Sequence, residues 1–290
     1  MDRIKFTKMH GIGNDYVYID CMASCPLYLP SLAREMSDRH RGIGGDGIIL
    51  ILPSSEADFK MRIFNADGSE ARMCGNGSRC VAKFVYDNHL TDKRHLTLET
   101  LSGVKHLFLK PGSDGLISEV TVDMGEPSLS CSDIPVNSVD KDWVNKPVAI
   151  DDTHTLYITA VSMGNPHAVI FCDDPYGIPF EKLGAEVELN PLFPDRANVE
   201  FVTIIDRNNI RVRVWERGSG ETQACGTGAC ASVVAAATLG LTDRNVTVQL
   251  AGGKLDIEWK ADDNHVMMTG PATTVFTGEY FLQNKEGKND

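Results

Sequence analysis

Two cysteines carry the clearest chemistry in this sequence, because each stands directly before a Gly-x-Gly and ahead of an apolar helical pattern. The sequence CGNG at residues 74–77 recurs as CGTG at residues 225–228, an offset of 151. A cysteine at a helix N-terminus lies beside unpaired backbone N–H groups and the positive end of the helix dipole, which favour the thiolate and lower the thiol pKa. We therefore predict that Cys74 and Cys225 are reactive groups and not merely small buried side chains.

Two similar acid–base groups suit one kind of reaction, the inversion of a carbon centre. One cysteine would remove the α-proton as thiolate, and the other would deliver a proton as thiol from the opposite face. Negative charge would then develop on the α-carboxylate, which two helix N-termini can stabilise without a metal or pyridoxal phosphate. The predicted donors are the first backbone amides of the two helices, those of Gly75, Asn76, Gly226 and Thr227.

The elements that must position these cysteines are also repeated at nearly one offset. Gly13-Asn14 recurs as Gly164-Asn165, residues 62–64 recur as 213–215, and Glu70 recurs as Glu221. We infer an α+β fold of two pseudo-symmetric domains from a duplication, each a curved mixed or antiparallel sheet or barrel wrapped round a central helix. The predicted domains are 1–126, completed by 275–290, and 127–274, with the active site in the cleft between them.

Hydrophobic periodicity and turn residues give the order of elements within each half. The proline-rich stretch 127–147 is predicted to be a linker. Residues 273–281 alternate and are expected to return to pair with the first domain. The glycine loop 41–47 follows a helix and precedes a strand, the wrong order for a dinucleotide site. The expected helices are 29–39, 77–88 and 229–239; the expected strands include 5–20 around a turn, 48–52, 59–65, 96–100, 105–110, 119–124, 157–172 around a turn, and 210–215.

Composition excludes several classes of protein. A net charge of −12 over 290 residues opposes binding to nucleic acid or an anionic membrane. The N-terminus has no apolar core like that of a secretion signal, so we expect a cytoplasmic protein. The eight cysteines match neither a disulfide scaffold nor the usual zinc spacings, and we predict no metal. The remaining six cysteines are expected to be small buried side chains.

The motifs around these residues resemble those of diaminopimelate epimerase. The similar blocks are HGIGNDY, IFNADGSEARMCGNGSRC, MGNPHAV, ANVEF and WERGSGETQACGTGACAS, which cover both halves in order. The resemblance implies a cofactor-independent epimerase that interconverts LL- and meso-diaminopimelate, in lysine and peptidoglycan precursor synthesis. It also implies two similar domains, each with a sheet around a helix.

The resemblance assigns roles to single residues. Cys74 and Cys225 are the acid–base pair, and His167 and Glu216 tune the thiols. A bidentate arginine and several asparagines can hold the second amino-acid head of the substrate. The implied substrate contacts are Asn14, Asn65, Asn165, Asn198, Glu216 and Arg217.

The sequence departs from the family pattern at two places. Gly47 stands where some members carry a glutamine that contacts the substrate, so this contact is lost or made by the backbone. Phe276 stands where the family often has a tyrosine at its dimer contact, and we expect a homodimer.

Several alternatives stay open from sequence. A racemase acting on proline or hydroxyproline would share the two-cysteine logic but would not need Arg217. A thiol redox protein would instead join Cys74 and Cys225 in a disulfide. Asn14 and Asn165 could be turn formers, and Glu70 and Glu221 could brace the two cysteine loops.

Overall fold

A computed structural model of the chain describes residues 3–151 and 155–282, and their contacts divide them into two compact units. Unit 1 runs to Val120 and resumes at Pro271, and unit 2 spans Thr121–Gly270. The sequence predicted these boundaries at residues 126 and 275. Part of the predicted completing segment, residues 283–290, lies outside the described residues.

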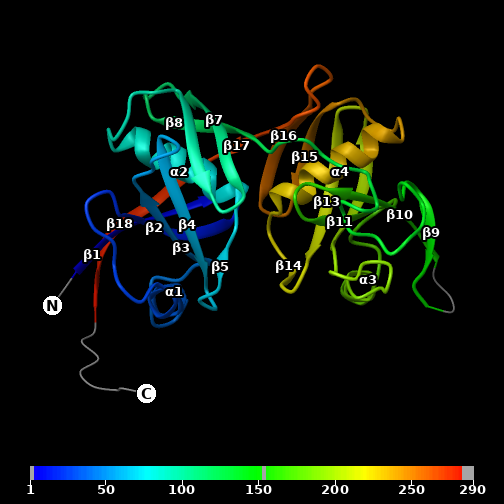
Figure 1. Cartoon of the computed structure of the whole chain (residues 1–290), viewed down its shortest axis with the longest axis horizontal. Coiled ribbons are helices and arrows are strands. Elements are labelled where there is room, and N and C mark those ends of the chain that lie inside the picture. Colours follow the sequence, from blue (N-terminus) through cyan, green and yellow to red (C-terminus); the bar gives the residue numbers. More distant parts are fainter. Residues whose placement is uncertain (1–2, 152–154, 283–290) are drawn as a thin grey trace. The chain divides into compact units, whose positions relative to one another are not determined.

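Unit 1 is a mixed sheet curved around one helix (Figure 1). Along the sheet, neighbouring strands are antiparallel except for the parallel pairs β2–β3 and β4–β6. Helix α2 is buried along most of its length, while α1 packs on the other face of the sheet against alternate residues such as Ile48 and Leu50. The elements are β1 (Arg3–Gly11), β2 (Asn14–Asp20), α1 (Leu29–Ser37), β3 (Gly47–Leu52), β4 (Phe59–Asn65), β5 (Glu70–Ala71), α2 (Gly75–Asp87), β6 (His95–Thr100), β7 (Gly103–Pro111), β8 (Ile117–Asp123) and β18 (Thr273–Phe281).

Unit 2 repeats this arrangement strand for strand. The hairpin β10–β11 corresponds to β1–β2, and the parallel pairs β11–β12 and β13–β15 correspond to β2–β3 and β4–β6. Helix α4, rich in alanine and valine, is buried inside, and α3 covers the outer face. The predicted duplicated α+β fold is therefore confirmed. The elements are β9 (Lys146–Ala149), β10 (Thr155–Ser162), β11 (Pro166–Phe171), α3 (Phe180–Glu188), β12 (Asn198–Asp206), β13 (Asn209–Glu216), β14 (Gly220–Glu221), α4 (Gly226–Thr238), β15 (Asn245–Leu250), β16 (Gly253–Trp259) and β17 (Val266–Pro271).

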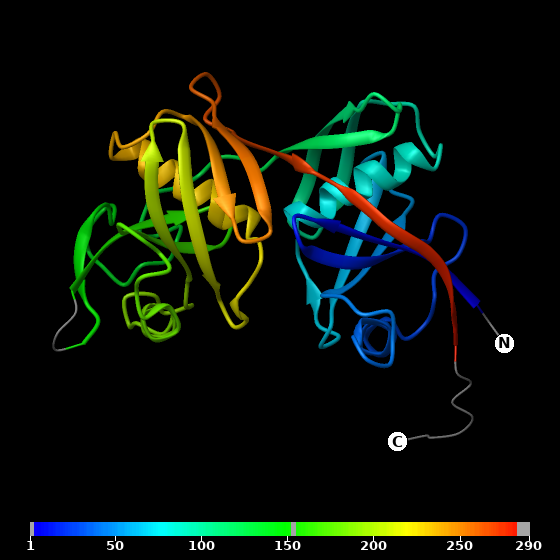
Figure 2. The same cartoon turned by 180° about the vertical axis from the view of Figure 1, so that it is seen from behind.

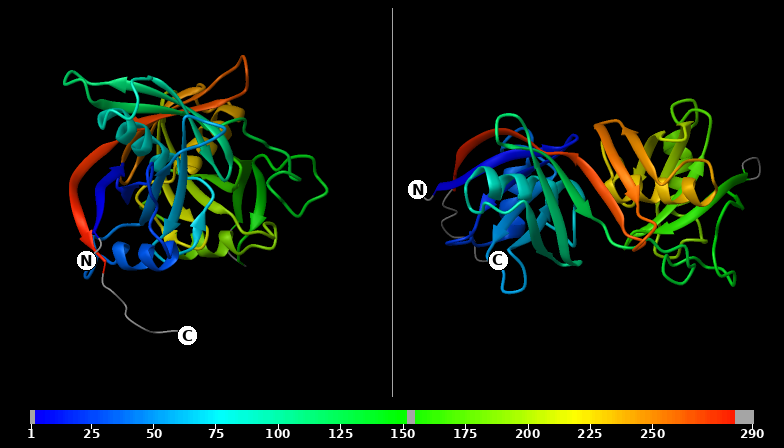
Figure 3. Two further views of the ribbon diagram at one scale, coloured as in Figure 1. Left: turned by 60° about the vertical axis from the view of Figure 1, so that its left-hand side comes forward. Right: turned by 90° about the horizontal axis from the view of Figure 1, so that it is seen from above.

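The C-terminal strand returns to unit 1, as its alternation suggested. Strand β18 pairs antiparallel with β1, from Arg3 opposite Phe281 to His10 opposite Thr273. Figure 2 shows β18 in red running beside the dark blue β1, and the views in Figure 3 agree. The first and last strands of the described chain thus close the same unit.

The prediction of a linker at 127–147 is wrong. Cys131, Ile134 and Val136 are each less than 8% exposed and belong to the hydrophobic core of unit 2. Prolines and polar residues broke the periodicity of this segment, yet three spaced apolar side chains are enough to anchor it against the outer face of the sheet.

Candidate functional site

The two predicted cysteines occupy the same position in the two units, the N-cap of the central helix. Cys74 is extended, with φ −141°, and its Sγ accepts a hydrogen bond from Gly77 N at 3.3 Å. Cys225 is also extended, with φ −108°, and its Sγ accepts from Gly228 N at 3.3 Å. The prediction that both cysteines stand at helix starts is confirmed.

Ion pairs of the same geometry brace the two loops that lead to these cysteines. Arg62 Nε lies 2.7 Å from Glu70 Oε1, and Arg213 Nε lies 2.7 Å from Glu221 Oε1. In each case a second guanidinium nitrogen donates to the other carboxylate oxygen at 3.0 Å. The bracing role considered for the two glutamates is therefore confirmed.

Amides and charged side chains surround Cys74 in unit 1. Its thiol donates to Asn14 Oδ1 at 3.2 Å, and Asn14 Nδ2 donates to Asp46 Oδ2 at 2.7 Å. Asn76 Nδ2 lies 3.5 Å from the same Asn14 oxygen, and Asn76 Oδ1 accepts from Arg79 Nη2 at 2.8 Å. Of the predicted residues, Asn14 and Asn76 thus meet at Cys74.

A buried histidine and glutamate lead towards Cys225 in unit 2. His167 Nδ1 lies 2.7 Å from Glu200 Oε1, and both side chains are completely buried. His167 Nε2 lies 3.1 Å from Asn165 Oδ1. Asn165 Nδ2 in turn donates to Thr227 Oγ1 at 3.3 Å. The Thr227 hydroxyl lies 3.5 Å from Cys225 Sγ. The side chains of Asn165 and Thr227 therefore lie between His167 and the Cys225 thiol in this chain of contacts.

The electrostatics of Cys225 differ from the sequence expectation. Burial raises the pKa of the Cys225 thiol well above its ordinary value, and the nearby carboxylates of Glu216 and Glu200 raise it further. The Thr227 hydroxyl and the Gly228 amide lower the same pKa, but by less. The expected lowering at the helix N-terminus is thus outweighed, because Cys225 is only 6% exposed.

The end of β13 places the remaining predicted residues of unit 2. Glu216 Oε1 accepts from the Thr222 hydroxyl at 2.5 Å. Asn198 Oδ1 accepts from Arg217 N at 2.9 Å, and Asn198 Nδ2 donates to Pro166 O at 3.0 Å. Arg217 is exposed and donates from Nη1 to a backbone carbonyl at 3.0 Å. Asn198 consequently holds the backbone from which the Arg217 guanidinium extends.

Asn65 and Gly47 lie opposite each other on β4 and β3. Asn65 is half-buried and donates from Nδ2 to Ser69 Oγ at 3.1 Å. A Cβ added to Gly47 would lie 2.2 Å from Phe64 O and 2.9 Å from Tyr16 Cε1. Because neither the carbonyl nor the ring can move freely, this backbone accepts only glycine, which explains the absence of a glutamine.

The other cysteines are mostly buried, as expected. Cys21, Cys80, Cys131 and Cys230 are buried and Cys172 is half-buried, but Cys25 is exposed, so that part of the prediction is wrong. Within residues 3–151 and 155–282, no group of three or more histidine, cysteine or acidic side chains could hold a metal ion. The same described residues include no helix both long and apolar enough to cross a membrane.

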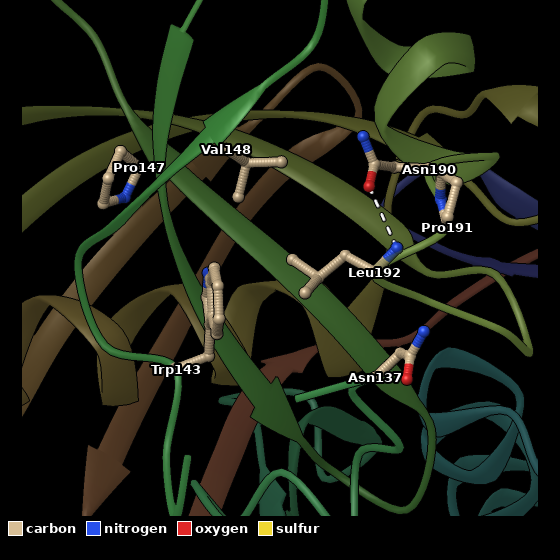
Figure 4. Close-up of a pocket in the computed structure, with 7 residues that line it drawn as sticks. All are labelled: Asn137, Trp143, Pro147, Val148, Asn190, Pro191 and Leu192. Carbon is tan, nitrogen blue, oxygen red and sulfur yellow. Dashed lines mark hydrogen bonds between the residues drawn. The ribbon is translucent and has the colours of Figure 1, made fainter. Parts of the chain in front are cut away.

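A shallow hollow in unit 2 contains none of the predicted site residues (Figure 4). Trp143, Val148 and Leu192 line it together with Pro147, Pro191 and two asparagines. Its walls are mainly apolar and carry no charged or nucleophilic side chain, so it offers no acid–base chemistry.

Sequence reasoning missed three charged residues near the cysteines, namely Asp46, Arg79 and Glu200. Arg79 and Glu200 are completely buried. A charged residue inside an otherwise apolar run was the available signal, since such residues are rarely buried without a partner. At the offset of 151 the residue equivalent to Glu200 is Ile49, and this contrast between a charged and an apolar residue also marks the position.

Known proteins are similar to this chain over nearly its whole length. A family model described as diaminopimelate epimerase matches residues 6–130 and 159–275. A diaminopimelate epimerase of Acetivibrio thermocellus is 53% identical, over 96% of this chain and 99% of its own. A diaminopimelate epimerase of Methanococcus maripaludis is 52% identical, over 95% of this chain and 99% of its own.

Solved structures with low sequence identity share the fold. A phenazine biosynthesis protein of the PhzF family from Bacillus anthracis has a TM-score of 0.71 at 16% identity, covering 97% of this chain and all of its own. A hydroxyproline epimerase from Agrobacterium vitis has a TM-score of 0.68 at 16% identity, covering 98% of this chain and 94% of its own.

Proposed function

The chain belongs to the diaminopimelate epimerase family, and from this we propose that it interconverts LL- and meso-diaminopimelate by a two-cysteine mechanism without a cofactor. The matched N-cap positions of Cys74 and Cys225 in the two duplicated units carry this proposal. The enzyme is an isomerase, and its product would serve lysine and peptidoglycan precursor synthesis in the cytoplasm.

In the proposed reaction each unit supplies one cysteine to the same α-carbon. The thiolate of one cysteine removes the α-proton, and the thiol of the other protonates the opposite face, so that one proton leaves the carbon and one returns. The first amides of α2 and α4 face the charge that develops on the α-carboxylate. These donors are the amides of Gly75, Asn76, Gly226 and Thr227.

We assign recognition of the second amino-acid head to the polar side chains outside the cysteine loops. Arg217 has an exposed guanidinium that can grip a carboxylate with two parallel hydrogen bonds. Glu216 can receive the ammonium group and also raises the pKa of Cys225. His167 would tune Cys225 through its hydrogen-bonded neighbours. The amide set for this recognition is Asn14, Asn65, Asn165 and Asn198, of which Asn198 would act by positioning Arg217.

One experiment tests the function. Reduced enzyme is incubated with LL-diaminopimelate in deuterium oxide, and the product is analysed by mass spectrometry and chiral chromatography. We expect meso product with one deuterium at the inverted carbon, and no product from Cys74→Ala or Cys225→Ala. Cys25→Ala is the matched control, since this thiol is exposed, and should retain normal turnover.

The same experiment separates the alternatives. Deuterium exchange into proline, with none into diaminopimelate, would indicate a proline-type racemase. Normal turnover in either single cysteine variant would contradict the two-base mechanism. Reversible formation of a disulfide between the two cysteines, without inversion of any amino acid, would indicate a redox protein.

We also propose a homodimer that uses the exposed strand β18. Val275, Phe276 and Phe281 are 54%, 46% and 51% exposed on this strand. The Phe276 ring meets Phe6 edge to face, with centroids 5.8 Å apart, which holds it in place. Ordered, exposed aromatic side chains of this kind are enriched at protein interfaces.

A further inference from the structure

The equivalent asparagines Asn14 and Asn165 have opposite amide orientations beside the two cysteines. We propose that Asp46 is a positioning residue that fixes the Asn14 amide so that Cys74 is presented as a proton donor. This inference rests on the proposed catalytic role of Cys74. It adds an asymmetry that the duplicated backbone does not supply.

In unit 1 the donor and acceptor of each hydrogen bond are fixed by a group that can only accept or can only donate. The Asp46 carboxylate can only accept, so the side chain of Asn14 must turn its NH₂ group towards it, and the distance is 2.7 Å. Asn14 Oδ1 then faces Cys74, 3.2 Å from the sulfur. At the other end the guanidinium of Arg79 can only donate, so it fixes Asn76 Oδ1, at 2.8 Å, and turns the Asn76 NH₂ group towards Asn14.

An oxygen acceptor at this distance favours one protonation state of the sulfur. A thiol at Cys74 donates to Asn14 Oδ1 while it accepts from Gly77 N, and both contacts are satisfied. A thiolate would instead meet the lone pairs of Asn14 Oδ1. The arrangement therefore selects the protonated form of Cys74.

In unit 2 the corresponding amide is turned the other way. Asn165 Oδ1 accepts from His167 Nε2, and Asn165 Nδ2 donates to Thr227. Because an amide oxygen can only accept, His167 Nε2 carries the proton of its contact with Asn165 Oδ1. The Thr227 hydrogen is then free to point at Cys225 Sγ, so this sulfur receives a donor.

The offset of 151 shows which substitutions produce the contrast. Ala197 stands at the place equivalent to Asp46, so nothing there fixes the Asn165 amide as Asp46 fixes Asn14. Thr227 replaces Asn76, and His167 replaces Tyr16. The asparagine is the same in both units, and its neighbours decide which end meets the cysteine.

Other charged and titratable groups face this region of unit 1 and remain in place in the test. Arg39 Nη2 donates to Asp46 Oδ1 at 3.0 Å and to Asp15 Oδ1 at 2.7 Å. Lys8 on β1 forms an ion pair with Asp15. Tyr18 on β2 is buried, which raises the pKa of its phenol, and the neighbouring Cys80 and Cys74 raise it further.

The test is the pH dependence of iodoacetamide alkylation at Cys74, measured peptide by peptide in the substrate-free enzyme. In Asp46→Ala the Asn14 NH₂ group loses the carboxylate that holds it, and the amide can turn this group to the sulfur against the longer, 3.5 Å contact from Asn76 Nδ2. Because one hydrogen bond changes sense, alkylation of Cys74 at neutral pH should rise about fivefold. Cys225 in the same sample, and Asp58→Ala as a matched aspartate variant of unit 1, should be unchanged.

A second variant keeps the proposal open to contradiction if Asp46→Ala does not fold. The exchange Asn14→Asp with Asp46→Asn puts the carboxylate beside Cys74 and the amide at the other position. Alkylation of Cys74 should then be slower than in the wild type. An unchanged or slower rate in folded Asp46→Ala, or a faster rate in the exchange variant, would overturn the proposal. Neither result depends on turnover, so a failure of the two-cysteine mechanism is seen separately, in Cys74→Ala.

Discussion

The buried pair of His167 and Glu200 predicts an unusual pattern of stabilities. The two side chains are completely buried and lie 2.7 Å apart, and Glu200 Oε2 has no hydrogen-bond partner among the described residues. Their equivalents in unit 1 at the offset of 151 are Tyr16 and Ile49, which shows that the fold accepts an uncharged pair at these positions. We consider three variants: His167→Phe, Glu200→Leu and the two substitutions together.

The magnitudes follow from what each substitution leaves behind. His167→Phe leaves a buried carboxylate without its partner and should cost about 3–5 kcal/mol. Glu200→Leu leaves a neutral imidazole with one unpaired nitrogen and should cost about 1–3 kcal/mol. The double variant leaves neither group unpaired and replaces them with apolar side chains of similar volume. It should therefore be more stable than His167→Phe alone, by roughly 2 kcal/mol or more.

Thermal unfolding followed by circular dichroism measures this pattern. At about 2–4 °C per kcal/mol for a unit of this size, His167→Phe should lower the Tm by roughly 6–20 °C. Adding Glu200→Leu should then raise the Tm again. Tyr16→Phe with Ile49→Leu is the matched control in unit 1 and should show additive effects. A double variant whose loss equals the sum of the two single losses would refute the reasoning, because the pair would then not be coupled.

Four further predictions concern the helix starts, the Cys225 thiol and strand β18. Gly228→Ala should lower stability by about 1–3 kcal/mol and reduce turnover, since its Cβ would lie 2.6 Å from a buried carboxylate oxygen and 3.2 Å from Cys225 Sγ. Gly77→Ala should be milder in denaturant unfolding, because its closest neighbour, at 2.7 Å, is the end of an isoleucine side chain. Burial raises the pKa of the Cys225 thiol in the folded state. The contribution of this thiol to the free energy of unfolding is therefore complete below the unfolded thiol pKa of about 8.5 and is lost as the pH rises above that value. Cys225→Ala should flatten this decline when unfolding curves are measured at increasing pH. Phe276→Asp should convert a dimer to monomer in analytical ultracentrifugation, and a wild type that sediments as a monomer would contradict the proposed interface.

Most of the fold could be predicted because the two halves of the sequence repeat the same motifs in the same order. The offset of 151 aligned strands and helices without any alignment to other chains, and the structure reproduces the same ladders in both units. Both cysteine positions followed from their glycine neighbours. The segment 127–147 failed because it has no counterpart in the first half of the chain and little periodicity, so its three core residues gave no local signal.

The site was harder to predict, because its decisive partners are remote in sequence. Asp46 lies 32 residues from Asn14, and Glu200 lies 33 residues from His167. Only the parallel pairing of β2 with β3 and of β11 with β12 brings these residues together. The high pKa of Cys225 was missed for a similar reason, since burial and distant carboxylates outweigh the local helix effect.

The contrast between the two units bears on how a duplicated site can invert a carbon. At the start of a turnover one sulfur must hold a proton and the other must be a thiolate, whereas two identical surroundings would give both cysteines the same proton affinity. The repeated backbone supplies matching helix N-termini and matching braces. The neighbours differ where the proton is held: an aspartate fixes an acceptor at Cys74, while a histidine, an amide and a hydroxyl lead a donor to Cys225. Divergence at a few equivalent positions therefore gives the two sulfurs different hydrogen-bonding surroundings on a symmetric scaffold.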